Sequence, residues 1–123
     1  MTTDESLGFL ALLKNDLRDA MRARNAAEIT TLRGLIAAVD NAQAVPVGDR
    51  HETYVFHAFG DGAVEVPRKA LGRAELLRLV ETEIRSRSDA ADDYRRLGRD
   101  DKARDLSQEV EILSRYGVPL ASG

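Results

Sequence analysis

The densest group of side chains that could do chemistry is basic and lies late in the chain. Five cations fall within ten residues: Arg95, Arg96, Arg99, Lys102 and Arg104. Guanidinium groups match the geometry of phosphate oxygens, so these residues could contact the backbone of a nucleic acid. Asp100 and Asp101 lie among them and lower the local net charge to +3. Because phosphate binding needs several unopposed cations, a solvated helix turn with compensating charges is the alternative.

A second basic group follows one face of the first predicted helix. Lys14, Arg18 and Arg22 step by four residues, which places them in a row on a helix surface. Asp16 and Asp19 are close neighbours and could compensate their charge. We therefore favour ordinary surface pairing here, and keep Arg18 and Arg22 as secondary candidates for nucleic-acid contact.

Three further charged residues lie on or beside apolar stripes. Arg87 interrupts the apolar face of the third predicted helix, Glu83 precedes it by four residues, and Arg33 lies close to the stripe of the second. A half-buried arginine is usually paired, and glutamate before arginine at this spacing is favourable in a helix. These residues predict an ion pair that fixes how the helices dock, with a ligand site as the alternative.

No pattern matches a metal, cofactor or catalytic site. His51 and His57, with the acidic residues Asp49, Glu52 and Asp61, have the spacing of no metal motif. The glycines of the same region lack the signature of a phosphate-binding loop. Cysteine is absent, which excludes disulfides and thiol chemistry. We predict no metal, no cofactor and no catalytic residue, and we disfavour enzymatic activity of the chain by itself.

Length and composition suit one small domain. The chain has 123 residues, of which 43% are apolar, enough for a single core. Its net charge of −3 lacks the basic excess of a dedicated nucleic-acid binder. The first residues contain no apolar segment typical of a signal peptide, and no apolar run reaches the length of a membrane span. We expect a cytoplasmic protein without a membrane partner.

Hydrophobic periodicity predicts four helices, at about residues 6–24, 26–43, 73–97 and 100–116. Asn25 and Glu28 have the form of a capping box at the start of the second helix. Gly34 inside that helix is expected to allow close helix approach, and Gly98 suits the end of the third helix. Short turns between neighbours predict an all-α fold of two antiparallel helical hairpins in a single domain, residues 1–123.

The insert between the hairpins, residues 44–72, breaks the helical pattern. Thr53–Phe56 and Ala63–Val66 are β-prone, and the segment between them is rich in glycine. These features predict a small β-hairpin, which would need to pack on the helices because a lone hairpin is marginal in water.

Four blocks in the right order resemble the GatB/YqeY family across roughly residues 7–116. They include Leu13–Arg24, Thr31–Val39 with Asn41 and Ala42, Glu83–Arg87 with Ala91 and Tyr94, and Gly98–Asp101 with Glu109 and Tyr116. On this resemblance Arg33, Asn41, Glu83, Arg87 and Gly98 are family-motif or structural polar positions. The chain departs from the family at Asp105 and Leu106 and at Gly117 and Val118. On this resemblance we expect the helical domain alone, without the small second helical domain of typical members.

The family is related to the tail of the B subunit of the tRNA-dependent amidotransferase, a carbon–nitrogen ligase with glutamine as amido donor. The resemblance therefore implies a non-catalytic protein associated with tRNA or with an amidotransferase complex, although family members are often labelled amidotransferase-like. The alternative is a protein-interaction or self-association module with no nucleic-acid role. It would use the apolar seam of the last helix or the aromatic residues Tyr54, Phe56 and Phe59 of the insert.

Overall fold

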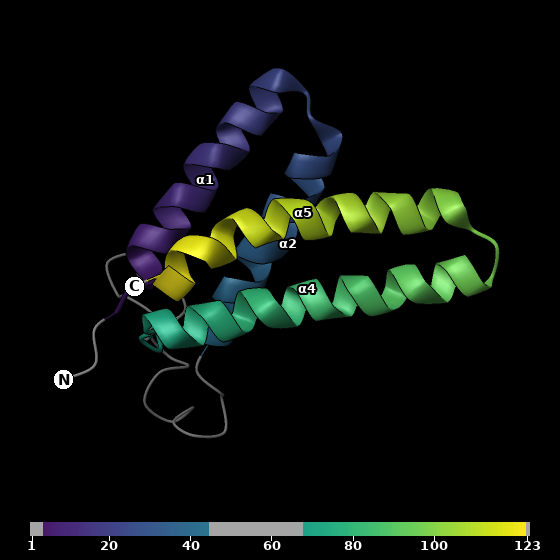
Figure 1. Cartoon of the computed structure of the whole chain (residues 1–123). Coiled ribbons are helices and arrows are strands. Elements are labelled where there is room, and N and C mark those ends of the chain that lie inside the picture. Colours follow the sequence, from purple (N-terminus) through teal and green to yellow (C-terminus); the bar gives the residue numbers. More distant parts are fainter. Residues whose placement is uncertain (1–3, 45–67, 123) are drawn as a thin grey trace, which may run out of the picture.

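The computed structural model describes residues 4–44 and 68–122. Within them the chain forms four helices: α1 Ser6–Ala23, α2 Ala26–Gln43, α4 Arg73–Arg96 and α5 Asp100–Ser122. Helices α1 and α2 make one antiparallel hairpin and α4 and α5 make a longer one (Figure 1). The predicted all-α class and the two hairpins are confirmed. The predicted β-hairpin lies outside the described residues.

Local signals set the two hairpin turns. Arg24 ends α1 with a φ of 55°, and the Asn25 side chain accepts the Glu28 N–H at 3.2 Å to begin α2. The Glu28 carboxylate, expected to reach back to Asn25, instead lies 3.5 Å from Arg115 on α5. Gly98 has a φ of 74°, so it takes the left-handed conformation expected of it after α4.

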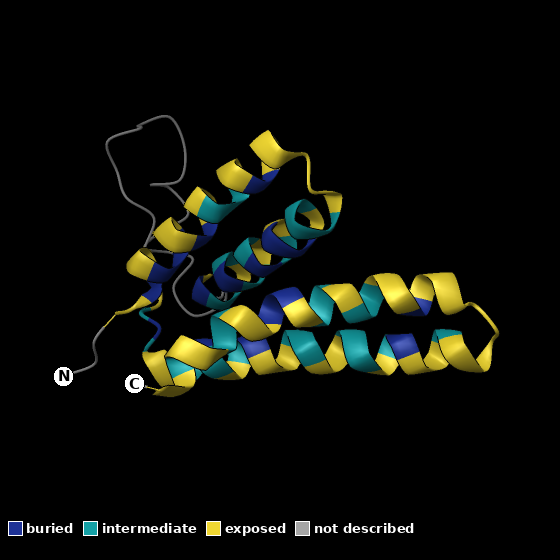
Figure 2. Ribbon diagram, turned by 45° about the horizontal axis from the view of Figure 1, so that its top comes forward, coloured by how far each residue is buried: buried dark blue, intermediate teal, exposed yellow. Residues whose placement is uncertain are grey.

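The core lies where the two hairpins cross. Helix α2 packs against α1 on one side and against α4 and α5 on the other. The fully buried apolar side chains come from all four helices: Leu13, Leu32, Leu35, Val39, Leu76, Val80 and Leu113. The outer part of the α4–α5 hairpin projects past α1 and α2 and is largely exposed (Figure 2).

Two predicted apolar faces differ in detail from the structure. Met21 continues the three-to-four-residue spacing of Leu10, Leu13 and Leu17, which predicts a buried position on α1. It is nevertheless 48% exposed, because Ala20 takes the inward position in the last turn. The seam of α5 packs on α4, with Ala103 and Leu113 buried, so this seam is already used within the chain.

The end of α5 was predicted wrongly. The helix continues past residue 116 to Ser122, with Pro119 inside it. Proline has no N–H to donate to the carbonyl of Arg115, which costs one helical hydrogen bond. Tyr116 and Leu120 pack against the core from this last stretch, and their burial offsets the lost bond.

A polar network joins the start of α1 to the segment before α4. The Asp4 carboxylate accepts hydrogen bonds from the Ser6 and Leu71 N–H groups at 3.0 and 3.3 Å and from the Ser6 hydroxyl. The buried Gln43 amide donates to the Ser6 hydroxyl at 2.7 Å. Ala44 and Arg68 form an antiparallel bridge beside it, so the start of the insert lies next to the segment before α4.

Candidate functional sites

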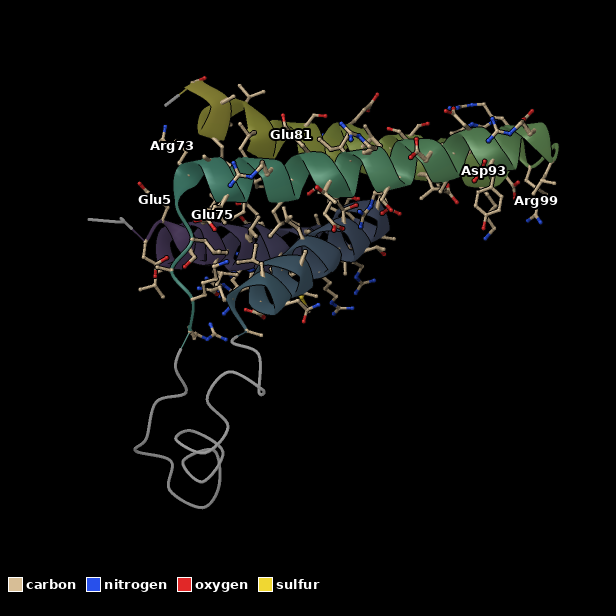
Figure 3. The ribbon with its side chains drawn as sticks, turned by 90° about the horizontal axis from the view of Figure 1, so that it is seen from below. Glu5, Arg73, Glu75, Glu81, Asp93 and Arg99 are labelled. Atoms are coloured by element: carbon tan, nitrogen blue, oxygen red, sulfur yellow. The ribbon has the colours of Figure 1, made fainter. Side chains whose placement is uncertain are left out.

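The basic cluster predicted from the sequence occupies the outer turn of the α4–α5 hairpin. Arg95 donates to Asp92 at 2.8 Å, Arg96 pairs with Asp93, and the Arg99 guanidinium lies 3.5 Å from Asp101. Figure 3 shows Asp93 and Arg99 at this end, far from Glu5, Arg73 and Glu75 at the base of the hairpin. Each of these arginine side chains is more than half exposed, so its ion pair is weak and exchangeable.

The charge of this turn is smaller than the sequence pattern indicated. Asp92 and Asp93, which precede the cluster, join Asp100 and Asp101, so residues 92–104 hold five basic and four acidic residues. A hydrogen bond from the backbone N–H of Lys102 lowers the pKa of the Asp101 carboxyl, and the Arg99 guanidinium lowers it further by a smaller amount. Lys102 itself is exposed and has no carboxylate within 4.0 Å among the described residues. It is therefore available to an incoming anion.

The structure does not bring the second basic group to this turn. Arg18 and Arg22 are exposed on α1, whose end lies apart from the α4–α5 turn in both ribbon views (Figures 1 and 2). Arg22 pairs with Asp19 at 2.9 Å, in keeping with the expected surface pairing. The two groups could engage one ligand only if it spans both hairpins.

Arg87 connects α4 to α5 and lies close to Gly34 of α2. Its guanidinium donates to Glu83 on its own helix at 2.9 Å and to Glu109 on α5 at 2.8 Å. A Cβ added at Gly34 of α2 would lie 3.0 Å from Arg87 Nη2. Burial lowers the pKa of Arg87, but the hydrogen bonds to Glu83 and Glu109 outweigh it and the pKa is raised. The predicted Glu83–Arg87 pair is present. Arg87 also pairs with Glu109, so the cluster links the two helices of the α4–α5 hairpin.

The remaining motif positions have surface or structural settings. Arg33 is exposed, and in residues 4–44 and 68–122 no carboxylate lies within ion-pair distance of it. Asn41 is exposed, and its carbonyl accepts the Ala44 N–H at 3.2 Å at the end of α2. Arg33 thus does not join the Arg87 cluster, contrary to expectation.

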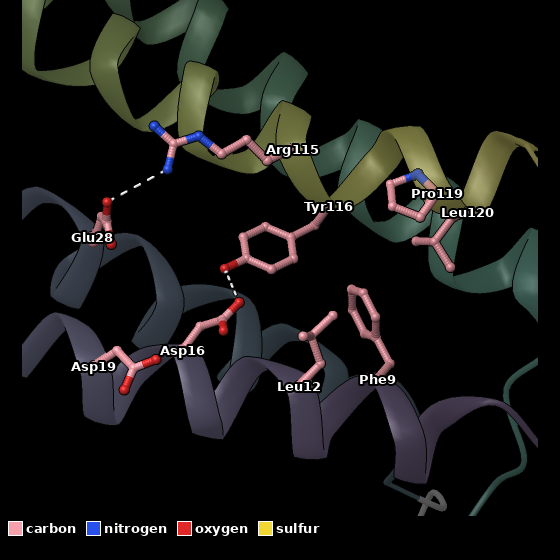
Figure 4. Close-up of a pocket in the computed structure, with 9 residues that line it drawn as sticks. All are labelled: Phe9, Leu12, Asp16, Asp19, Glu28, Arg115, Tyr116, Pro119 and Leu120. Atoms are coloured by element: carbon pink, nitrogen blue, oxygen red, sulfur yellow. Dashed lines mark hydrogen bonds and ion pairs between the residues drawn. The ribbon is translucent and has the colours of Figure 1, made fainter.

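A cavity that the sequence did not predict opens between α1 and α5. It has a volume of about 500 Å³, and nine residues line it: Phe9, Leu12, Asp16, Asp19, Glu28, Arg115, Tyr116, Pro119 and Leu120. The Tyr116 hydroxyl donates to Asp16 at 2.7 Å across the cavity, and the Phe9 and Tyr116 rings meet edge to face at 6.5 Å (Figure 4). Burial, together with the hydrogen bond to Asp16, raises the pKa of the Tyr116 phenol, which keeps it a neutral donor.

The sequence signal for this cavity is a second pattern on α1. Phe9, Leu12, Asp16 and Asp19 recur at spacings of three and four, beside the stripe that packs on α2. Which face of α1 meets the other hairpin depends on how the hairpins cross, and one helical pattern cannot give that angle.

No group of three His, Asp or Glu side chains suited to a metal ion occurs in the described part of the chain. The candidate ligands His51 and His57 lie outside it. Within the same described residues, no helix combines the length and apolar content needed to cross a membrane.

Comparison with known sequences identifies the family. The sequence profile of YqeY-like proteins matches residues 10–120. The chain belongs to the YqeY-like family. This YqeY-like chain is also 29% identical over 115 residues to "altered inheritance of mitochondria protein 41, mitochondrial" of Clavispora lusitaniae. The match covers 92% of the chain and 55% of that relative, so the YqeY-like chain spans about half the relative's length.

Proposed function

We propose that this YqeY-like chain is a non-catalytic protein that associates with tRNA, as an accessory to a tRNA-dependent amidotransferase, and contacts RNA phosphates through the α4–α5 turn. The observation that supports the proposal is the placement of exposed cations at the end of a projecting hairpin. A protruding turn can enter a groove of folded RNA that a flat surface cannot reach. A cytoplasmic location is part of the same proposal.

The arginines of the α4–α5 turn can bind RNA phosphates although they are paired with aspartates, because these ion pairs can break and re-form with a phosphate. An exposed arginine–aspartate pair contributes about 0–1 kcal/mol, so its loss costs little. A phosphate contact releases counterions from the nucleic acid, which favours binding at low salt. Arg95 and Arg99 can therefore turn from Asp92 and Asp101 to phosphates, and Lys102 can bind a phosphate directly.

The test is fluorescence anisotropy of labelled bulk tRNA with the purified chain, titrated over salt. We expect binding that weakens with salt, and a smaller salt dependence in Arg95→Glu/Arg99→Glu, by about two units of log–log slope. Arg78→Glu/Arg85→Glu is the matched control, because it changes the same charge at exposed positions of α4 away from the turn. Equal losses in both double variants would show that only net charge matters and would refute the site.

The accessory role needs a separate measurement. We expect the chain to bind a purified tRNA-dependent amidotransferase more tightly when tRNA is present, because the RNA would bridge the two. Binding that is independent of tRNA and of Arg95 and Arg99 would favour the alternative of a protein-interaction module.

A further inference from the structure

A continuous groove runs along the open face of α1. A second, smaller cavity adjoins the one between α1 and α5, and the two share Phe9, Leu12 and Leu120 as lining residues. Glu5, which precedes α1, and the α1 residues that line them fall on one side of the helix: Gly8, Phe9, Leu12, Asp16 and Asp19. The last turns of α5 form the opposite wall, as Figure 4 shows for Tyr116, Pro119 and Leu120.

The length of the groove matches a short helix. The wall formed by α1 and its N-cap residue extends from Glu5 to Asp19, which at a rise of 1.5 Å per residue is about 21 Å. A guest helix of about 14 residues has the same length. A compact small molecule would fill only one of the two cavities.

The walls combine an apolar floor with an acidic rim. Phe9, Leu12 and Leu120 supply the floor, and Leu12 is 47% exposed within the described structure. Four acidic and two basic side chains line the groove, so its net charge is negative: Glu5, Asp16, Asp19 and Glu28 against Arg73 and Arg115.

In the larger cavity, Asp16 is the acid best placed to receive a cation. Arg115 is 3.5 Å from Glu28, and Asp19 pairs with Arg22. Asp16 accepts from the neutral Tyr116 hydroxyl, and among the described residues no cation lies within 4.0 Å of its carboxylate. Its negative charge is therefore not neutralised by an ion pair.

We propose that this groove binds a basic amphipathic helix of a partner protein. Apolar side chains at i, i+3 or i+4, and i+7 of the guest would cover Phe9, Leu12 and Leu120. A lysine or arginine beside them would pair with Asp16. A second copy of the chain is a poor guest, because the described helices bury their own apolar stripes in the core. The site is distinct from the α4–α5 turn, so the inference does not depend on the proposed RNA contact.

The probe for the test is a fluorescent synthetic peptide of leucine and lysine, about 14 residues long, with leucine at the spacing of an amphipathic helix. We measure its binding to the full chain by anisotropy and map it from amide chemical shifts. We expect shifts at Phe9, Leu12, Asp16 and Tyr116. A peptide with glutamate in place of lysine should bind at least about ten-fold more weakly, a difference of about 1.4 kcal/mol.

Two variants test the walls separately. Leu12→Lys places a cation on the floor, and Asp16→Asn removes the charge while its amide oxygen still accepts from Tyr116. Both positions are open enough for the fold to tolerate the change. Each should weaken peptide binding about ten-fold. The matched controls Leu97→Lys and Asp89→Asn, at exposed positions outside the groove, should bind the peptide like the wild type.

Three results would overturn the proposal. The first is equal weakening by the groove variants and their controls, and the second is equal affinity for the glutamate peptide. The third is self-association, measured by sedimentation, that Leu12→Lys abolishes while the peptide fails to bind, since a second copy would then fill the groove. Binding of tRNA should be unchanged in Leu12→Lys, which separates failure here from failure of the RNA proposal.

Discussion

At the residue scale, Arg87 connects α4 to α5 at the point where α2 crosses them. Its side chain is 16% exposed and Glu109 is 17% exposed, so both charges are largely removed from water. We expect Arg87→Met to lower the free energy of unfolding by about 3 kcal/mol, because it leaves two carboxylates without their cation. Urea unfolding at neutral pH measures the change.

The exposed pair Arg22–Asp19 supplies the control for this prediction. Its side chains are 75% and 62% exposed, so Arg22→Met should cost less than about 0.5 kcal/mol. Similar losses in the two variants would show that burial of the Arg87 cluster does not strengthen it.

Two glycines in helices should respond oppositely to alanine. A Cβ at Gly34 would press on Arg87 Nη2 at 3.0 Å, whereas one at Gly117 would meet Val80 at an ordinary 3.6 Å. Gly117→Ala should stabilise the chain by about 0.5–1 kcal/mol through helix propensity. Gly34→Ala should destabilise it by about 1 kcal/mol, because the pinned guanidinium has to move. Thermal unfolding distinguishes the two signs.

A double-mutant cycle tests the cause assigned to Gly34. With Arg87→Met in place, the obstructing group is gone, so Gly34→Ala should become neutral or stabilising. A penalty that persists in this background would mean that the backbone of α2, and not Arg87, requires glycine.

These residues also show how far the sequence predicts polar contacts. The spacing of Glu83 and Arg87 within one helix predicted their pair directly. Glu109 could not be predicted as the third member, because its position beside Arg87 depends on how α5 lies along α4. Arg33 was expected near the cluster, yet the rotation of α2 turns it to the surface and puts Gly34 opposite Arg87.

At the element scale, local signals predicted three helix boundaries well but not the end of α5. Asn25, Gly72 and Gly98 lie at the boundaries that their backbone preferences favour. Gly117 and Pro119 are residue types that commonly end a helix, yet α5 continues to Ser122 because packing of Tyr116 and Leu120 outweighs that preference. A local rule cannot include the burial of a side chain against another hairpin.

The hydrogen bonds of Asp4, which link the start of α1 to the segment before α4, should make the stability of the chain depend on pH. The hydrogen bond from the Ser6 hydroxyl lowers the pKa of Asp4 below its ordinary 3.8, and the hydrogen bond from the Ser6 backbone N–H adds a smaller effect in the same direction. Since the folded pKa is lower than the unfolded one, the stability contributed by Asp4 is present above pH 3.8 and is lost as the pH falls through the folded pKa. Thermal unfolding between pH 2 and pH 7 measures this loss.

The variant Asp4→Asn isolates that contribution. It should be less stable than the wild type at pH 7, and the difference between them should shrink towards pH 2, where the wild-type carboxyl is protonated. A difference that stays constant with pH would mean that the amide is a poorer partner for reasons of shape, and the ionised carboxylate would have no special role.

At the scale of the whole molecule, the two candidate sites differ in how predictable they are. The basic turn is a local cluster, so the sequence located it, and the i,i+3 spacing of Asp92 and Asp93 with Arg95 and Arg96 could have predicted its compensation. The groove depends on the angle between two hairpins and on a helix that extends past Pro119. Neither feature is encoded in one local pattern.

Stability should decrease along the α4–α5 hairpin from its base to its outer turn. Val80 and Leu113 lie in the shared core, whereas residues 95–102 are all exposed. Amides in that outer turn can exchange by local opening, while those of the base require near-global unfolding. We expect hydrogen exchange at least about ten-fold faster around Gly98 than around Val80, measured by NMR or mass spectrometry. Uniform protection would show that the hairpin opens as one unit, and slowing confined to the outer turn on adding tRNA would locate the RNA contact there.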